Sequence, residues 1–308
     1  MHKSHWWKIL PATLLASLML AGCGNNHAQN ATSTTEQPQT TSSTATSQSS
    51  SQNNDASTVQ YLAGLTYQSN TNPIVQVNNG QATLNINNWN NNHVQYSSLD
   101  KLNRTSAPAI AYLDAQNVAN DSLRVRQTVE PTGWHQKFDS NHEAILNRGH
   151  IIAYSLSKGI NMNGQYNPND ESGDQNNPRN LFTQTAFCNQ KLQTIYETKV
   201  RNALKQGAKV IYRVQPIFQG NDLMAKGVWM QAVGTNGLNF NVYLYNVQPG
   251  YQFNYATGTS VVDNNMQVPT PAAAPHFNDN NNYNKHYSNY SHHYYQKNRN
   301  HYYHEQQY

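Results

Sequence analysis

Short runs of alternating apolar and polar residues fill the middle of the chain and predict β-strands. Residues 72–79 and 82–87 alternate on either side of an Asn-Gly dipeptide, a pattern typical of a β-hairpin. Further apolar or β-prone runs occur at residues 109–113, 123–126, 148–154, 210–218, 228–233 and 238–247. Residues 159–174 are rich in Gly, Asn and Asp, so this segment is expected to be a long loop.

One stretch has helical rather than alternating spacing. From Thr185 to Lys205, apolar side chains recur at roughly every third or fourth position. Thr183 or Thr185 can cap the start of this helix, and Gly207 can end it. Strands before and after one strong helix favour a single α+β domain over residues 59–262, which is long enough to bury a core.

The N-terminus has the pattern of a bacterial lipoprotein signal. A basic and aromatic start over residues 1–8 precedes an apolar run that is short for a membrane span, and small residues come just before Cys23. We therefore expect residues 1–22 to be removed and Cys23 to be lipidated. That modification would anchor the protein at the extracellular face of the bacterial cytoplasmic membrane, from which a fraction could be released. The alternative is ordinary secretion, with Cys23 lost or left as a free thiol.

Both flanks of the predicted domain have low sequence complexity. Residues 23–58 are mostly Ser, Thr, Gln, Asn and Ala, which bury too little apolar surface to fold, so we expect a disordered tether. Residues 263–308 begin Pro-rich and continue as a His, Tyr and Asn tract, which we expect to be a disordered tail. Stacking on nucleic acid, weak binding of transition metals and adhesion to wall polymer all fit this tail, as does a plain solvated segment.

Composition adds two constraints. After Cys23, the 308-residue chain has only one other cysteine, Cys188, so the folded domain has no intramolecular disulfide. The formal net charge of +4 permits contact with a polyanion without identifying a nucleic-acid binder. Zinc-site spacings, Gly-rich phosphate loops and Gly-x-Ser-x-Gly elbows do not occur in the sequence.

Three motifs that carry chemistry follow one another along the chain. Asn147-Arg148-Gly149-His150 lies at a predicted strand, and Asn177-Pro178-Arg179-Asn180 follows in a loop. Thr185-Ala186-Phe187-Cys188-Asn189-Gln190 then opens the predicted helix, which also carries Glu197. Together with Thr132-Gly133-Trp134-His135, this order resembles the DNA/RNA non-specific endonucleases with a ββα-metal core, and within them the bacterial DNA-entry nuclease branch.

The resemblance implies both a fold and an activity. The fold would be α+β, with a ββα-metal core, a mixed and largely antiparallel sheet, and one long metal-binding helix. The activity would be that of a sugar-nonspecific endonuclease, which hydrolyses phosphodiester bonds in DNA and RNA with Mg²⁺ or Mn²⁺ and leaves 5′-phosphate ends. Such an enzyme contacts its nucleic-acid partners through phosphates, so little base preference is expected.

By the same resemblance, His150 would be the general base and Asn189 would bind the metal. A neutral imidazole can deprotonate the attacking water, and an amide oxygen is a hard ligand suited to Mg²⁺. At 100° per residue, Gln193 and Glu197 share a helix face with Asn189. Glu197 could therefore hydrogen-bond Asn189 or a metal-bound water.

Asn180 and Arg148 complete the predicted catalytic group. Asn180 matches the family's second asparagine, and would hold either the metal's water shell or the loop that carries His150. Arg148 could hold a phosphate or the transition state with its guanidinium. Candidates for contacts with the substrate backbone are Arg179, Lys191 and Arg201.

Two residues in the motifs invite other interpretations. Asn147 stands where the family usually has Asp, and we expect retained activity with an altered pH or metal dependence. Cys188, next to Asn189, raises the possibility of a Cys/His nucleophile. However, helical projection turns Cys188 toward the apolar face, as expected of a buried structural thiol.

A second class of function also fits the sequence. The protein could be a surface nucleic-acid-binding lipoprotein or adhesin with weak or lost catalysis. In that case Asn147 would mark the lost activity, and the His/Tyr tail would do the binding.

Overall fold

The computed structural model describes residues 46–275, with side chains from Asp55 onward. The predicted signal peptide, Cys23, most of the predicted tether and the His/Tyr tract lie outside these residues. Within the described part of the chain, no helix combines the length and apolarity that crossing a membrane requires.

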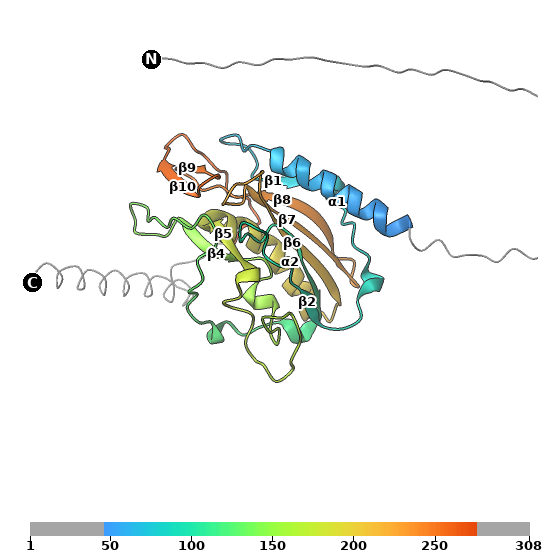
Figure 1. Ribbon diagram of the computed structural model, residues 1–308. Coiled ribbons are helices and arrows are strands. Elements are labelled where there is room, and N and C mark those ends of the chain that lie inside the picture. Colours follow the sequence, from blue (N-terminus) through green and yellow to red (C-terminus); the bar gives the residue numbers. More distant parts are fainter. Residues whose placement is uncertain (1–45, 276–308) are drawn as a thin grey trace, which may run out of the picture. The chain divides into compact units, whose positions relative to one another are not determined.

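A six-stranded antiparallel sheet forms the centre of the domain, with the strand order β1-β8-β7-β6-β3-β2 (Figure 1). Its strands are β1 (Ile74–Gln76), β2 (His93–Gln95), β3 (Ala109–Leu113), β6 (Val210–Ile217), β7 (Gly227–Gly234) and β8 (Asn239–Tyr245). Two small antiparallel pairs accompany it: β4 (Leu146–His150) with β5 (Leu181–Thr185), and β9 (Tyr251–Asn254) with β10 (Thr259–Val262).

The helices are α1 (Thr46–Gly64), the π-helix η7 (Cys188–Gln193) and α2 (Thr194–Lys205), which directly continues η7. Short 3-10 turns are η1 (Asn78–Gly80), η2 (Ile86–Asn88), η3 (Ala115–Asn117), η4 (Asp121–Leu123), η5 (Tyr154–Leu156) and η6 (Pro178–Asn180).

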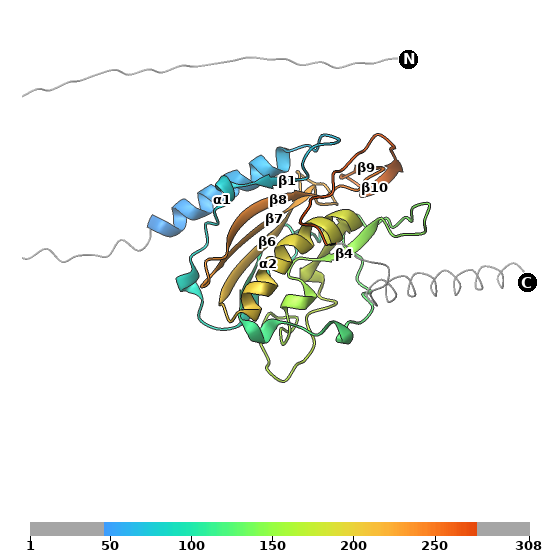
Figure 2. The same cartoon turned by 180° about the vertical axis from the view of Figure 1, so that it is seen from behind.

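Helices α1 and α2 lie on opposite faces of the sheet, as the views in Figures 1 and 2 show together. Successive strand residues point to opposite faces, so Tyr212 and Arg213 of β6 mark the two sides. Tyr212 packs near Phe240, whose ring lies 5.0 Å from that of Tyr196 in α2. Arg213 instead forms an ion pair with Asp55 of α1, at 3.3 Å.

Four strands predicted from apolar or alternating runs are confirmed. Strands β3, β6, β7 and β8 lie where the sequence places them, within a few residues. The predicted loop over residues 159–174 has neither helix nor strand, apart from isolated bridges.

The predicted hairpin over residues 72–87 is wrong. Strand β1 pairs with β8 and not with the segment after the Asn-Gly turn. That segment instead donates its backbone hydrogen bonds to side chains of the sheet, from Ala82 N to Asn239 Oδ1 (2.9 Å) and from Thr83 N to Gln231 Oε1 (2.8 Å). Side-chain amides of the sheet thus accept the hydrogen bonds that a neighbouring strand would otherwise accept. A local sequence pattern does not predict such contacts.

The predicted strand boundaries near the site also need correction. Residues 123–126 form no strand, and the strand predicted over residues 148–154 is β4, so His150 ends a strand instead of beginning one. The helix predicted from Thr185 is confirmed: it starts at Ala186, directly after β5, and Thr185 Oγ1 caps it by accepting from Cys188 N at 3.1 Å.

The described domain extends beyond the predicted boundaries at both ends. Residues 46–58, predicted as tether, belong to α1, whose Leu62 is fully buried in the core. Residues 263–275, predicted as tail, bring Val268 and Ala274 into the same core. Both segments contain few apolar residues on average, so the sequence did not reveal that a few of their side chains pack in the core.

Leu62→Ala tests whether α1 is part of the domain. Removing a fully buried leucine side chain should lower the free energy of unfolding by about 2–5 kcal/mol in urea denaturation. Its exposed neighbour supplies the control, since Tyr61→Ala should change the free energy by no more than about 0.5 kcal/mol. Equal effects of the two substitutions would show that α1 does not pack as described.

Candidate active site

Strands β4 and β5 pair with each other, which places the motif that ends at His150 against the strand that leads to Asn189. Gly149 pairs with Phe182, and His150 pairs with Leu181. Gly149 must lack a side chain, because an added Cβ would lie 2.1 Å from Oε1 of Gln184. The glycine of the motif therefore makes room for the Gln184 side chain.

The His150 ring is held by groups from two other segments. Its Nε2 lies 3.2 Å from the carbonyl oxygen of Gln175, and the Gln127 amide lies 3.3 Å from Nε2 and 3.5 Å from Nδ1. A carbonyl oxygen can only accept a hydrogen bond, so we assign the proton of the neutral ring to Nε2. In this tautomer Nδ1 is the acceptor of the ring, and the Gln127 amide faces it.

The surroundings of His150 favour the neutral ring. Burial, and secondarily the charge of Arg124, lower the pKa of His150 from 6.5 to about 4, although the carbonyls of Gln175 and Asp174 oppose the shift. At neutral pH the ring is therefore uncharged, as a general base requires.

Asn147 and Asn189 contact each other directly. Asn189 Nδ2 donates to Asn147 Oδ1 at 2.9 Å, and Gln190 Nε2 donates to the same oxygen at 3.2 Å. With its nitrogen engaged, Asn189 keeps its Oδ1 as a potential metal ligand. Asn147 thus retains the acceptor function of the usual aspartate without its charge.

The turn that carries Asn189 is a π-helix, a form that is often found at functional sites. The predicted face relation therefore holds only in part. Gln193 Nε2 donates to Glu197 Oε1 at 2.8 Å, whereas Asn189 bonds to Asn147 and has no direct hydrogen bond with Glu197. The His150 ring likewise makes no direct contact with Asn189 among the described residues.

Gln193 connects the helix to the base. Its Nε2 also donates to the backbone oxygen of His150 at 2.8 Å, and its Oε1 accepts from Gln184 Nε2 at 2.8 Å. Gln184 and Gln193 are both fully buried. A buried amide network thus fixes β4, β5 and the helix relative to one another.

Glu197 is a buried carboxylate with two arginines nearby. Burial raises the pKa of Glu197, while the Gln193 hydrogen bond and the charges of Arg201 and Arg124 lower it. Arg201 donates to Ser155 Oγ at 3.0 Å, and its buried Nε has no hydrogen-bond partner. Arg124, which also influences His150, forms an ion pair with Asp121 at 3.1 Å.

Asn180 is fully buried and holds backbone just after His150. Its Oδ1 accepts from Ile152 N at 2.8 Å, and its Nδ2 donates to Ile152 O at 3.0 Å. Of the two roles open for Asn180, this geometry supports the one of holding the loop at His150.

The remaining predicted arginines and lysine make contacts within the protein. Arg148 stacks over the Trp134 ring at 4.4 Å and lies 3.6 Å from Glu130. Arg179 bonds to the loop at Met162 and Asn163, and Lys191 donates to Pro275 O at 3.0 Å. Each of these three side chains is therefore held in place by contacts inside the domain.

Cys188 is a structural thiol. It is fully buried, and burial raises its pKa to about 12. A thiol that stays protonated at neutral pH cannot act as the nucleophile.

Sequence reasoning missed several groups around His150. Arg124 falls in a segment that was predicted as a strand, and Gln127 and Gln175 come from irregular loops. None of the three lies in a motif, so only the folded structure brings them to the ring.

A family of known proteins matches the part of the chain that carries this candidate site. Residues 83–236 match the sequence model of the DNA/RNA non-specific endonucleases. The chain belongs to the DNA/RNA non-specific endonuclease family. It is therefore an endonuclease, and the α+β fold expected from the sequence is confirmed.

Two structures of NucA from Streptococcus agalactiae resemble this nuclease and support the bacterial DNA-entry nuclease branch. The magnesium-bound structure is 28% identical, with a TM-score of 0.56, over 68% of this chain and 97% of NucA. The metal-free structure is 30% identical, with a TM-score of 0.54, over 68% of this chain and 96% of NucA.

At the candidate site, oxygen atoms of Asn189 and Glu197 are the donors that a divalent cation could use. Among residues 46–275, no group of three or more His, Cys, Asp and Glu could hold a metal ion. Asn189 Oδ1 is available, and the buried carboxylate of Glu197 has one hydrogen bond from a side chain. Few protein ligands and several waters are typical of Mg²⁺.

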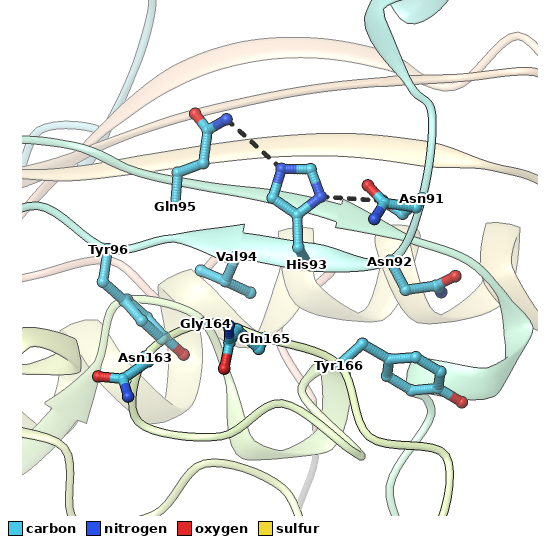
Figure 3. Close-up of a pocket in the computed structure, with 10 residues that line it drawn as sticks. All are labelled: Asn91, Asn92, His93, Val94, Gln95, Tyr96, Asn163, Gly164, Gln165 and Tyr166. Atoms are coloured by element: carbon cyan, nitrogen blue, oxygen red, sulfur yellow. Dashed lines mark hydrogen bonds between the residues drawn. The ribbon is translucent and has the colours of Figure 1, made fainter.

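A polar hollow of about 550 Å³ lies apart from these residues, between β2 and the 159–174 loop (Figure 3). Its lining comes from residues 91–96 and 163–166 and includes no Asp, Glu, Lys or Arg. None of the predicted site residues lines this hollow.

Gly149→Ala tests the packing of the motif that ends at His150. The new methyl group must displace Gln184, which should lower the free energy of unfolding by about 1–3 kcal/mol and slow DNA cleavage. Gly64→Ala is the matched control, because nothing lies within 4 Å of its added Cβ. Urea denaturation and initial cleavage rates should separate the two variants, and a Gly149→Ala protein as stable and active as Gly64→Ala would contradict the assigned geometry.

Proposed function

We propose that this nuclease hydrolyses phosphodiester bonds of DNA and RNA with one Mg²⁺ ion, His150 as general base and 5′-phosphate products. Mn²⁺ is expected to substitute for Mg²⁺. The observation that carries the proposal is the neutral His150 ring, whose Nε2 faces the Gln175 carbonyl. That arrangement leaves Nδ1 to take a proton from water.

His150 would work as a base in spite of its low pKa. The ring is neutral in the free protein, so no proton has to leave before catalysis. A phosphate bound nearby would favour the imidazolium and raise the pKa of His150, which strengthens the base once substrate is present. The Gln127 amide, 3.5 Å from Nδ1, would have to yield its place to the attacking water.

Asn189 would hold the metal ion through Oδ1, with Asn147 fixing the orientation of its amide. When bound, the ion supplies positive charge to the phosphate and the leaving oxygen. Glu197 would accept hydrogen bonds from water in the site, and Gln193 holds its carboxylate in place.

Arg124 and Arg201 would supply positive charge for the substrate phosphate. Both lie close enough to Glu197 to lower its pKa, and the buried Nε of Arg201 has no hydrogen-bond partner. A phosphate oxygen is a suitable acceptor for such a donor. Arg148, Arg179 and Lys191 remain candidates for contacts with the nucleic-acid backbone.

The place of action is proposed from the N-terminal sequence. Cys23 follows an apolar segment and small residues, as in lipidated bacterial proteins. Lipidation there would hold the nuclease at the outer face of the cytoplasmic membrane. An adhesin without catalysis is less well supported, because His150, Asn189 and Glu197 are all present.

His150→Ala and Asn189→Ala test the mechanism. Each substitution should lower the rate of DNA cleavage at fixed Mg²⁺ by about a hundredfold or more, through loss of the base or of metal positioning. Cleavage by the wild type should stop with a chelator and return with Mg²⁺.

The control is His135→Ala, which removes an exposed histidine and should leave the rate unchanged. Near-normal cleavage by a folded His150→Ala protein would contradict the proposed base. Cleavage that persists in chelator would contradict the proposed metal.

A further inference from the structure

Asp174 is a buried carboxylate next to the segment that faces His150. Asp174 is only 5% exposed. Asp174 Oδ2 accepts two hydrogen bonds, from Asn177 Nδ2 at 3.0 Å and from Asn180 Nδ2 at 3.2 Å. One oxygen atom thus orients two buried amides.

Both amides hold backbone that surrounds the base. Asn180 bonds to the N–H and the carbonyl of Ile152, two residues after His150. Asn177 caps the 3-10 turn η6 through Arg179 N at 3.1 Å and donates to Met162 O at 3.1 Å. The carboxylate therefore joins the end of β4 to the loop that leads into β5.

The same residue also sets the position of the His150 acceptor. Gln175, whose carbonyl accepts from His150 Nε2, directly follows Asp174. Asp174 N donates to Ser157 Oγ at 3.0 Å, so this backbone is fixed as well. Loss of the Asp174 side-chain bonds would loosen the Gln175 carbonyl and the backbone after His150 together.

Burial of this carboxylate is unfavourable for the folded state. Burial raises the pKa of Asp174, against the lowering effects of Tyr96, Asn177, Asn180 and the Arg179 charge. Tyr96, which also lines the polar hollow in Figure 3, is thus one of the groups that favour the charged form of Asp174. Removing a carboxyl group from water costs free energy, which its hydrogen bonds with Asn177 and Asn180 offset in part.

We propose that Asp174 is a positioning residue for His150: it fixes the Gln175 carbonyl and, through Asn180, the backbone after the ring. This role rests on the proposed function, in which His150 is the base. It acts through other groups, so Asp174 itself does not touch the substrate.

The test compares Asp174→Ala, Asp174→Asn and the control Glu171→Gln in the full chain. Asp174→Ala should lower kcat by about 10- to 100-fold with KM unchanged, because the base is misplaced while substrate contacts remain. Asp174→Asn keeps one acceptor oxygen, so its loss of kcat should be smaller. Glu171 lies in the same loop, forms an ion pair with Lys158 and contacts neither amide, so Glu171→Gln should behave as the wild type.

A pH profile separates positioning from simple destabilisation. In Asp174→Ala, a loosened and better hydrated His150 should have a pKa nearer its ordinary value, so kcat should begin to fall at a higher pH than in the wild type. Thermal unfolding identifies the variants that fold. If Asp174→Ala does not fold, the comparison rests on Asp174→Asn, with the same expected directions.

A folded Asp174→Asn or Asp174→Ala protein with unchanged kcat and an unchanged acid limb would overturn the positioning role. A wild type without Mg²⁺-dependent cleavage would instead contradict the proposed function itself. The two failures are therefore distinguishable in one set of measurements.

Discussion

The hydrogen bonds of Gln193 are the constraint on which the candidate site depends. One buried amide joins the helix to the backbone of His150, to Glu197 and, through Gln184, to the strand beside the base. Buried amides left without partners would be costly, so the network has few alternative arrangements. The glycine before His150 follows from this packing, since Gln184 fills the space over Gly149.

Around this network, the domain places charges where water is largely excluded. Glu197 and Asp174 are buried carboxylates with raised pKa values, and Arg201 has a buried nitrogen without a partner. In the proposed site, the neutral His150 ring, the Asn189 amide and the two arginines are held in place before substrate arrives, and the Gln127 amide is the group that must move aside.

Short motifs in the sequence named His150 and Asn189 as candidate site residues, but they did not show which groups hold them. Alternation located the strands from Val210 to Tyr245. Arg124, Gln127 and the Gln175 carbonyl reach His150 only through loops that no local pattern defines. Helix α1 was missed for a similar reason, because its attachment depends on Leu62 and on the pairing of Asp55 with the distant Arg213.

The most direct test of this account is the titration of the His150 ring by NMR, with its signals assigned by comparison with His150→Gln. The structure predicts a neutral ring protonated on Nε2, with a pKa of about 4 in the free protein. The pKa is lowered because burial disfavours the charged imidazolium. The ring should therefore gain its second proton only well below pH 6.5. A pKa at or above 6.5, or a neutral ring protonated on Nδ1, would contradict the claim that the fold holds His150 as a ready base.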